Sequence, residues 1–137
     1  MSEKTLTMFV VPASGDVPTE AEYLEKAKGI MNFTTELVYD IDFYKIHEHK
    51  VTTDWYGVIY TSEKFDDNLL EAIPVFLDCC PEEALIFYKR HTEEDGALVY
   101  SKAPRMFRKD IIIHYNLMPI NPDVKFETVL DGWIEDV

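Results

Sequence analysis

Cysteine and glycine are scarce in this chain of 137 residues, which contains two cysteines and five glycines. The two cysteines, Cys79 and Cys80, are adjacent, so a disulfide between them would be strained, and no second cysteine pair completes a zinc site. The sequence also lacks a glycine-rich phosphate-binding loop and a nucleophile elbow. These absences argue against a disulfide-stabilised scaffold, a structural zinc site and the common motifs of nucleotide-binding and hydrolytic enzymes.

Long hydrophobic runs are also missing, because no apolar stretch is long enough to cross a bilayer. The chain is nevertheless 47% apolar and 13% aromatic, which is too hydrophobic for a disordered protein. Its length suits one self-sufficient domain over residues 1–137. The first residues show no secretory signal pattern, so we expect a cytoplasmic protein, or a virion-associated one if the source is a bacteriophage.

Basic residues are half as frequent as acidic ones, 13 against 26, and the formal net charge is −13. Such an excess of acid repels phosphate backbones, so we expect neither direct nucleic-acid binding nor membrane binding. The charge is unevenly distributed, because residues 85–113 carry six basic and four acidic side chains. This segment is therefore the best candidate for contact with an acidic partner.

Hydrophobic periodicity predicts an α/β fold in which a mixed sheet of about five or six strands packs with two main helices in two or three layers. The predicted strands cover residues 5–11, 37–44, 55–60, 84–89, 97–100 and 110–115. The predicted helices cover residues 19–31 and 66–80, the second with Asp66 as its N-cap. Pro74 is expected to bend or break that second helix, and residues 93–96 are expected to form a hairpin turn.

The middle of the chain shows a Trp-led apolar strand followed by a helix, from Thr53-Asp54-Trp55 through residues 57–60 to residues 66–77. This pattern resembles the Rossmann-like nucleotide-sugar glycosyltransferases, in which such a strand ends in an Asp-x-Asp motif. The resemblance implies a Mn²⁺ or Mg²⁺ ion at the strand end, bound to the diphosphate of a nucleotide sugar.

The chain departs from that family at the metal position. Tyr60 and Ser62 stand where the family has its two acids, and Glu63 is left as the charged oxygen donor. The resemblance therefore implies a reduced, non-catalytic form of the fold. Asp40 and Asp42 offer a second possibility, because strand geometry would put both carboxylates on one face. A metal site at Asp40, Asp42 and Glu63 is the alternative to a solvated strand face.

The basic segment ends in a cluster of four cations, Lys102, Arg105, Arg108 and Lys109. If this part of the chain turns helically, the two arginines lie together and can clamp a carboxylate or phosphate. Pairing with acids of the same chain is the other possibility. Trp133, near the C-terminus, needs a surface to cover it, either on this chain or on a partner.

The hypothesis that these features favour is a non-catalytic, glycosyltransferase-like acidic protein that acts through protein–protein contacts as an assembly or accessory component. Its partner would be another protein or a second copy, and its small size would suit the compact genome of a bacteriophage. Two alternatives stay open. One is a miniature nucleotide-sugar glycosyltransferase that uses Mn²⁺ or Mg²⁺, and the other is an acidic inhibitor that mimics nucleic acid.

Overall fold

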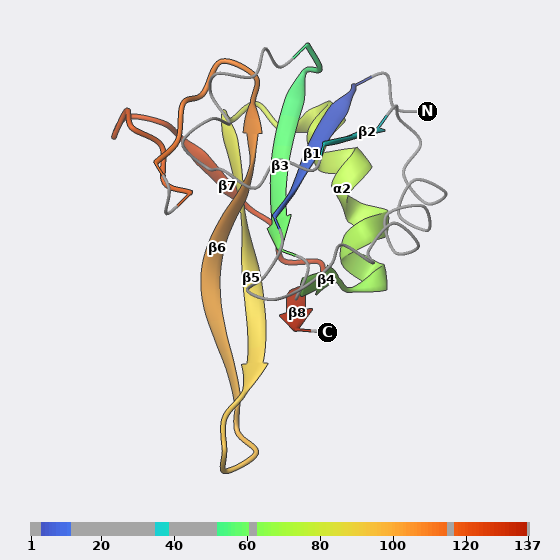
Figure 1. Ribbon diagram of the computed structural model, residues 1–137, viewed down its shortest axis with the longest axis vertical. Coiled ribbons are helices and arrows are strands. Elements are labelled where there is room, and N and C mark those ends of the chain that lie inside the picture. The colour runs from blue at the N-terminus through green and yellow to red at the C-terminus, as the bar shows by residue number, and fades with distance from the viewer. Residues whose placement is uncertain (1–3, 12–34, 39–51, 61–62, 115–116, 137) are drawn as a thin grey trace.

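The computed structural model describes residues 4–11, 35–38, 52–60, 63–114 and 117–136, which form one mixed β-sheet and one helix (Figure 1). The elements in chain order are β1 (Leu6–Val11), β2 (Thr35–Val38), β3 (Trp55–Tyr60), β4 (Glu63–Phe65), α2 (Asp67–Cys79), β5 (Ala84–Thr92), β6 (Leu98–Arg108), β7 (Phe126–Thr128) and β8 (Ile134–Asp136). Within these residues no helix is long and apolar enough to cross a membrane.

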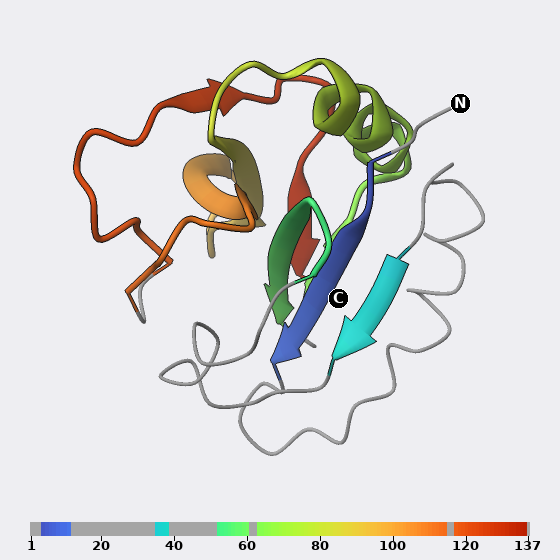
Figure 2. The same cartoon turned by 90° about the horizontal axis from the view of Figure 1, so that it is seen from above.

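The sheet joins a parallel half to a largely antiparallel half. Its strand order is β2-β1-β3-β6-β5-β8-β4, and β7 pairs with β5 outside this path. β1 runs parallel to both β2 and β3, which lie on either side of it (Figure 2), whereas β6 runs antiparallel to β3 and β5. The α/β class and the mixed sheet are thus confirmed. The strands exceed the expected five or six because β4, β7 and β8, at three residues each, are too short to show a periodic pattern.

Four of the predicted strands and one predicted helix are found close to their expected positions. β1, β3, β5 and β6 overlap the strands expected at 5–11, 55–60, 84–89 and 97–100, although β6 continues to Arg108, and α2 is the expected second helix. The helix expected at residues 19–31 lies outside the described residues. Of the strand expected at 37–44, the described part is the end of β2.

The strand expected at residues 110–115 is wrong. A turn closes directly after β6, where the Ile111 amide donates to the Arg108 carbonyl at 3.0 Å. Beyond it, Ile113 forms an isolated bridge with Pro119 and is buried. The apolar run therefore packs onto the sheet as irregular chain instead of pairing along its edge.

Helix α2 buries one apolar stripe, formed by Leu69, Leu70, Ile73 and Leu77. Asp66 is the N-cap residue as expected, but its side chain makes no capping hydrogen bond. The helix continues through Pro74, so the alternative of a break at this residue is wrong. Tertiary packing of the apolar stripe on both sides of the proline compensates for the missing backbone donor.

The two faces of the sheet carry separate hydrophobic clusters, because neighbouring side chains of each strand point to opposite faces. α2 packs on the first cluster, which includes Leu6, Met8, Trp55, Ile59, Leu85, Phe87 and Met106. The second cluster contains Phe9, Tyr56, Val58, Ala84, Phe107, Ile113, Leu117 and Val124, so the irregular segment after β6 covers this face. The centre of the sheet is therefore buried on both faces.

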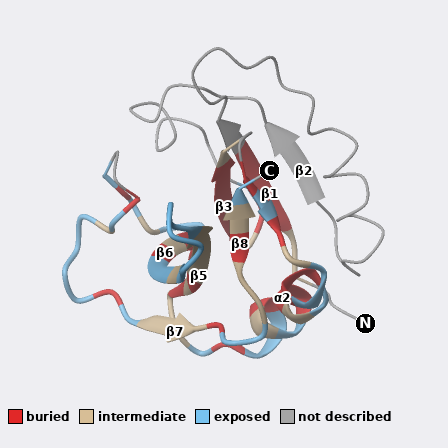
Figure 3. Cartoon of the chain, turned by 90° about the horizontal axis from the view of Figure 1, so that it is seen from below, coloured by how far each residue is buried: buried red, intermediate tan, exposed pale blue. Residues whose placement is uncertain are grey.

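Strands β5 and β6 form a hairpin whose distal part extends beyond the rest of the sheet (Figure 1). We call its residues 88–102 the arm; at its base, Lys89 and Arg90 pair with β8. At the tip the Gly96 amide donates to the Glu93 carbonyl at 2.9 Å, and Gly96 has a positive φ of 86°, which confirms the expected turn. Figure 3 views the chain from the arm's end, where exposed residues predominate.

Candidate functional site

A buried carboxylate on β4 is the centre of an ion-pair network. Glu63 is 1% exposed, and both of its oxygens accept hydrogen bonds from Arg105, at 2.5 Å from Nη1 to Oε1 and 2.8 Å from Nη2 to Oε2. The Lys89 ammonium lies 2.7 Å from Oε2, and the Tyr60 amide donates to Oε1 at 3.1 Å. Glu63 therefore accepts from two cations and one backbone donor.

Arg105 reaches Glu63 because of a β-bulge in the hairpin. Leu85 pairs with Met106 and the next residue, Ile86, pairs with Pro104, so Arg105 is the extra residue on β6. A bulge redirects the side chain of its extra residue, and here Arg105 is 5% exposed. The helical turn that the clamp would require does not form, because β-pairing with β5 continues on both sides of the bulge.

The guanidinium of Arg105 lies beside the end of β3. Its Nη1 is 3.5 Å from the Val58 carbonyl oxygen, and its Cζ is 5.3 Å from the centroid of the Tyr60 ring. The Nε atom is buried and has no hydrogen-bond partner among the described residues. A bidentate carboxylate pair and an aromatic face together fix the orientation of this cation.

The network extends to the C-terminal strand through Lys89. Its ammonium also lies 3.2 Å from an oxygen of Asp136 on β8. β8 is parallel to β5 on one side and antiparallel to β4 on the other. Lys89, on β5, therefore contacts one carboxylate on β4 and one on β8, and so helps to hold the C-terminal strand in the sheet.

The electrostatics of Glu63 favour its charged form. Burial, the largest single influence, raises the pKa of a carboxyl, but hydrogen bonds and charge from Arg105, with a hydrogen bond from Lys89, lower the pKa of Glu63 overall. For Lys89, burial lowers the pKa, but the hydrogen bond and charge of Glu63 raise it overall. Both groups are therefore ionised near neutral pH, and neither has the pKa expected of a general acid or base there.

A second ion-pair group lies around Glu135 on β8. The carboxylate accepts from the Arg90 guanidinium at 2.6 Å and from the Trp133 indole at 2.9 Å, and the Lys64 ammonium lies 3.4 Å away. The indole hydrogen bond is the largest of the influences that lower the pKa of Glu135. Arg90 also stacks over the Trp133 ring, 4.3 Å from its centroid. The Trp133 ring is thus covered by Arg90 of the same chain.

The four predicted cations do not gather into one cluster. Arg105 pairs with Glu63, whereas Arg108 donates to the carbonyl oxygens of Glu82 and Cys80 and lies over the Trp55 ring. On an extended strand these two arginines are held at separate places, and Arg105 takes the other possibility, pairing with an acid of the same chain. Lys102 and Lys109, by contrast, are exposed.

Of the proposed metal ligands, Glu63 alone lies within the described residues. Asp40 and Asp42 lie outside the described residues, and within those residues no three potential metal ligands of the His, Cys, Asp and Glu types form a group. Glu63 does not fit the role implied by the resemblance, because a divalent cation there would compete with Arg105 and Lys89 for both oxygens. Both oxygens of this carboxylate are already bound by protein cations.

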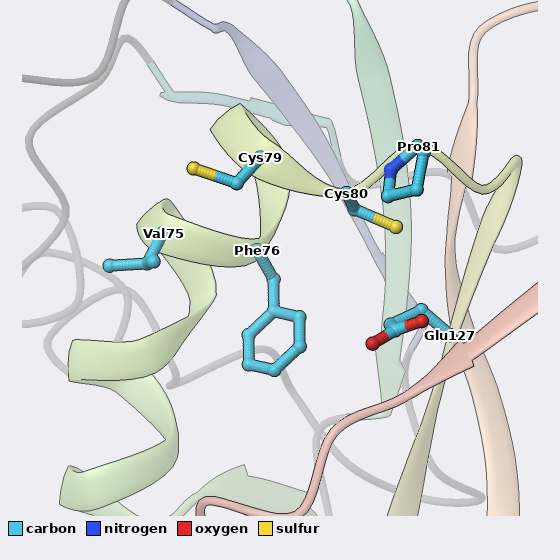
Figure 4. A pocket seen from close by; sticks show the side chains of 6 residues that line it. All are labelled: Val75, Phe76, Cys79, Cys80, Pro81 and Glu127. Atoms are coloured by element: carbon cyan, nitrogen blue, oxygen red, sulfur yellow. The ribbon is translucent and has the colours of Figure 1, made fainter.

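A small pocket opens between the end of α2 and β7 (Figure 4). Its volume is about 170 Å³, and its lining residues are Val75, Phe76, Cys79, Cys80, Pro81 and Glu127. Ligand pockets for small molecules usually measure about 300–1,000 Å³, so this one is too small for a nucleotide sugar. The Cys80 thiol lies 3.8 Å from the Glu82 carbonyl, and burial raises its pKa, which makes it a poor nucleophile.

Lys89, Arg90 and Glu135 were missed as partners in the sequence, although Lys89 carried a usable signal. Leu85 and Phe87 are buried, and Lys89 follows them on the same face of β5 by strand alternation. A charge on the buried face of a strand requires an opposite charge nearby. The identity of that partner depends on the bulge at Arg105 and on the short strands β4 and β8, which have no periodic pattern of their own.

No protein-family model matches the chain, and no curated protein matches it. One similar solved structure is a glycosyltransferase involved in the glycosylation of the major capsid of PBCV-1, with a TM-score of 0.44 and 12% sequence identity. The match covers 77% of this chain and 61% of that chain, so this chain spans less than two thirds of that protein's length. At this TM-score the likeness supports neither a family nor an activity.

Proposed function

We propose that this chain is a non-catalytic protein that acts through protein–protein contacts, as an assembly or accessory component, and that the arm is its contacting element. The observation that carries the proposal is the exposure of two large apolar side chains on the projecting hairpin. Leu98 is 53% exposed and Tyr100 is 50% exposed, on neighbouring positions of the same face of β6. Exposed apolar and aromatic side chains on a projecting element are a common feature of interaction surfaces.

The ion-pair network supports the non-catalytic part of the proposal. Glu63 occupies the acidic position that remains at the strand end, and its oxygens are bound by Arg105 and Lys89. An arrangement in which two cations bind both oxygens of one acid positions strands; it does not leave that carboxylate available to a substrate. The network joins β4, β5, β6 and β8 at the base of the arm.

The direct test places a photoreactive group on the arm of the full-length chain in producing cells. Tyr100→benzoylphenylalanine should give a cross-linked adduct with a protein that mass spectrometry identifies, and Leu98→Lys in the same chain should reduce its yield. The matched control, Glu71→benzoylphenylalanine on the exposed face of α2, should give no such adduct. Absence of an adduct at position 100 would overturn the assignment of the arm.

Two further measurements separate the alternatives. Calorimetry with Mn²⁺ and uridine or guanosine diphosphate sugars at millimolar concentration should show no binding. Turnover of such a sugar that is lost in Glu63→Gln, or in an Asp40→Asn and Asp42→Asn variant, would establish the enzyme instead. The nucleic-acid mimic differs in salt dependence, because its adduct yield would fall steeply as salt rises, whereas an apolar contact would persist.

A further inference from the structure

Along the arm, no described strand pairs with one of the two edges of β6. β3 pairs with β6 at residues Met106–Arg108 alone, and β5 lies on the other side of β6 along its whole length. From residue 98 to residue 102, β6 therefore pairs with one described strand, β5. Such an edge presents a row of backbone donors and acceptors to a further strand.

The hydrogen-bond pattern identifies which residues face this open edge. At the turn the Glu93 amide donates to the Ala97 carbonyl at 2.8 Å, and bonded pairs alternate along an antiparallel ladder. Val99 and Ser101 then bond to β5, whereas the amides and carbonyls of Leu98, Tyr100 and Lys102 point outward. The same three residues have exposed side chains, so backbone groups and side chains are both accessible.

The open edge has a defined end. The next outward position is Pro104, which has no amide hydrogen, and the bulge at Arg105 follows it. The usable edge therefore consists of three outward residues with a charge at one end and an apolar side chain at the other. A short edge with these limits suits one defined register and disfavours extended aggregation.

We infer that a second copy of this chain pairs with the open edge, β6 against β6 and antiparallel, about a twofold axis at Tyr100. In this register Tyr100 faces the Tyr100 of the second copy, and Leu98 faces its Lys102. All three outward residues of each copy then form bonded pairs, and no like charges stand opposite each other. The inference rests on the proposed function and names its partner.

Charge complementarity favours a second copy as the occupant. The turn that precedes Leu98 carries Glu93, Glu94 and Asp95, and the pairing brings it beside the Lys102 end of the other copy's strand. A twofold contact uses both open edges and therefore stops at the dimer.

Sedimentation equilibrium of the full-length chain tests the register through a pair of matched substitutions. The wild-type chain should dimerise reversibly. Leu98→Lys places two lysine pairs opposite each other in the dimer and should weaken dimerisation about tenfold. Adding Lys102→Leu exchanges the two side chains, so that each lysine again faces a leucine of the second copy. The double variant, Leu98→Lys with Lys102→Leu, should therefore restore the wild-type dimerisation constant to within about threefold.

Amide hydrogen exchange locates the contact. The amides of Leu98, Tyr100 and Lys102 should gain protection as protein concentration rises, whereas those of Val99 and Ser101 should be protected at every concentration. A chain that stays monomeric at millimolar concentration, a dimer unaffected by Leu98→Lys, or protection that appears elsewhere would overturn the inference. If the chain is monomeric yet photo-cross-links from position 100 to a different protein, the proposed function stands and this inference falls.

Discussion

The two halves of β6 show how one strand can serve two purposes. In the body half, Arg105, Met106 and Phe107 are consecutive and all buried, since β3, β5 and both covered faces surround them. In the arm half, Leu98 and Tyr100 are about half exposed, and β5 is the one described neighbour. Burial along this strand therefore follows the number of neighbouring elements. We expect substitutions in the body half to change stability, and substitutions in the arm half to change contact with a partner.

The largest effect is expected at the cation of the body half. Arg105→Met leaves Glu63 buried with Lys89 as its remaining cation, and breaking a buried pair by removing one partner costs about 3–5 kcal/mol. We expect a loss near 3 kcal/mol, because Lys89 still contacts one oxygen. Urea unfolding followed by circular dichroism measures this loss.

The control for Arg105→Met also removes the Glu63 carboxylate, which that substitution leaves without its main partner. Arg105→Met combined with Glu63→Gln should recover at least half of the lost stability, because the uncompensated buried carboxylate is gone. If the double variant is as unstable as the sum of the two single variants, the ion pair is not the source of the effect, and packing at the bulge would account for it.

Acid should weaken the same network. The folded-state pKa of Glu63 lies below its ordinary value near 4.3, so its contribution to stability is fully present above that value. That contribution is lost as the pH falls through the lower, folded-state pKa. The urea midpoint of the wild-type chain should therefore drop more steeply below about pH 4.3 than that of Glu63→Gln. Parallel curves for the two proteins would contradict this account.

A smaller effect is expected where strands approach closely in the body. A Cβ at Gly57 would lie 2.7 Å from the Met8 sulfur and 3.2 Å from the Arg105 carbonyl oxygen, so Gly57→Ala should cost about 1–3 kcal/mol through overpacking. The matched substitution on the arm is Gly96→Ala. No atom lies within 4 Å of its added Cβ, and its cost of about 1 kcal/mol comes from the positive φ of 86°. Thermal unfolding compares the two variants, and a smaller loss for Gly57→Ala than for Gly96→Ala would contradict the crowding.

The body was more predictable from the sequence than the site. β3 and α2 carry complete apolar patterns, so their positions follow from periodicity alone. The strands that complete the site, β4 and β8, have three residues each and form because neighbouring strands pair with them. Their position depends on contacts distant in sequence, which no local pattern encodes.

Two residues of the network, Glu63 and Arg105, stood out in the sequence, but their pairing did not. Glu63 was a metal ligand only in the alternative interpretation, and pairing of Arg105 with acids of the same chain was one of two possibilities; the structure pairs the two residues with each other. The missing information was the bulge, which turns Arg105 out of strict alternation. The arm's turn, in contrast, was readable, because Gly96 after three acidic residues is a local signal.

The smallest effect on folding is expected at Leu98, on the exposed side of the arm. Leu98→Ser should change the free energy of unfolding of the monomer by no more than about 0.5 kcal/mol, because the side chain is 53% exposed. The matched body variant, Phe107→Ser, buries a hydroxyl in place of a fully buried ring and should cost more than 3 kcal/mol. Urea unfolding at low protein concentration keeps dimerisation out of the measurement. If Leu98→Ser destabilised the monomer by several kcal/mol, Leu98 would belong to the core, and the exposure of the arm would no longer argue for a partner.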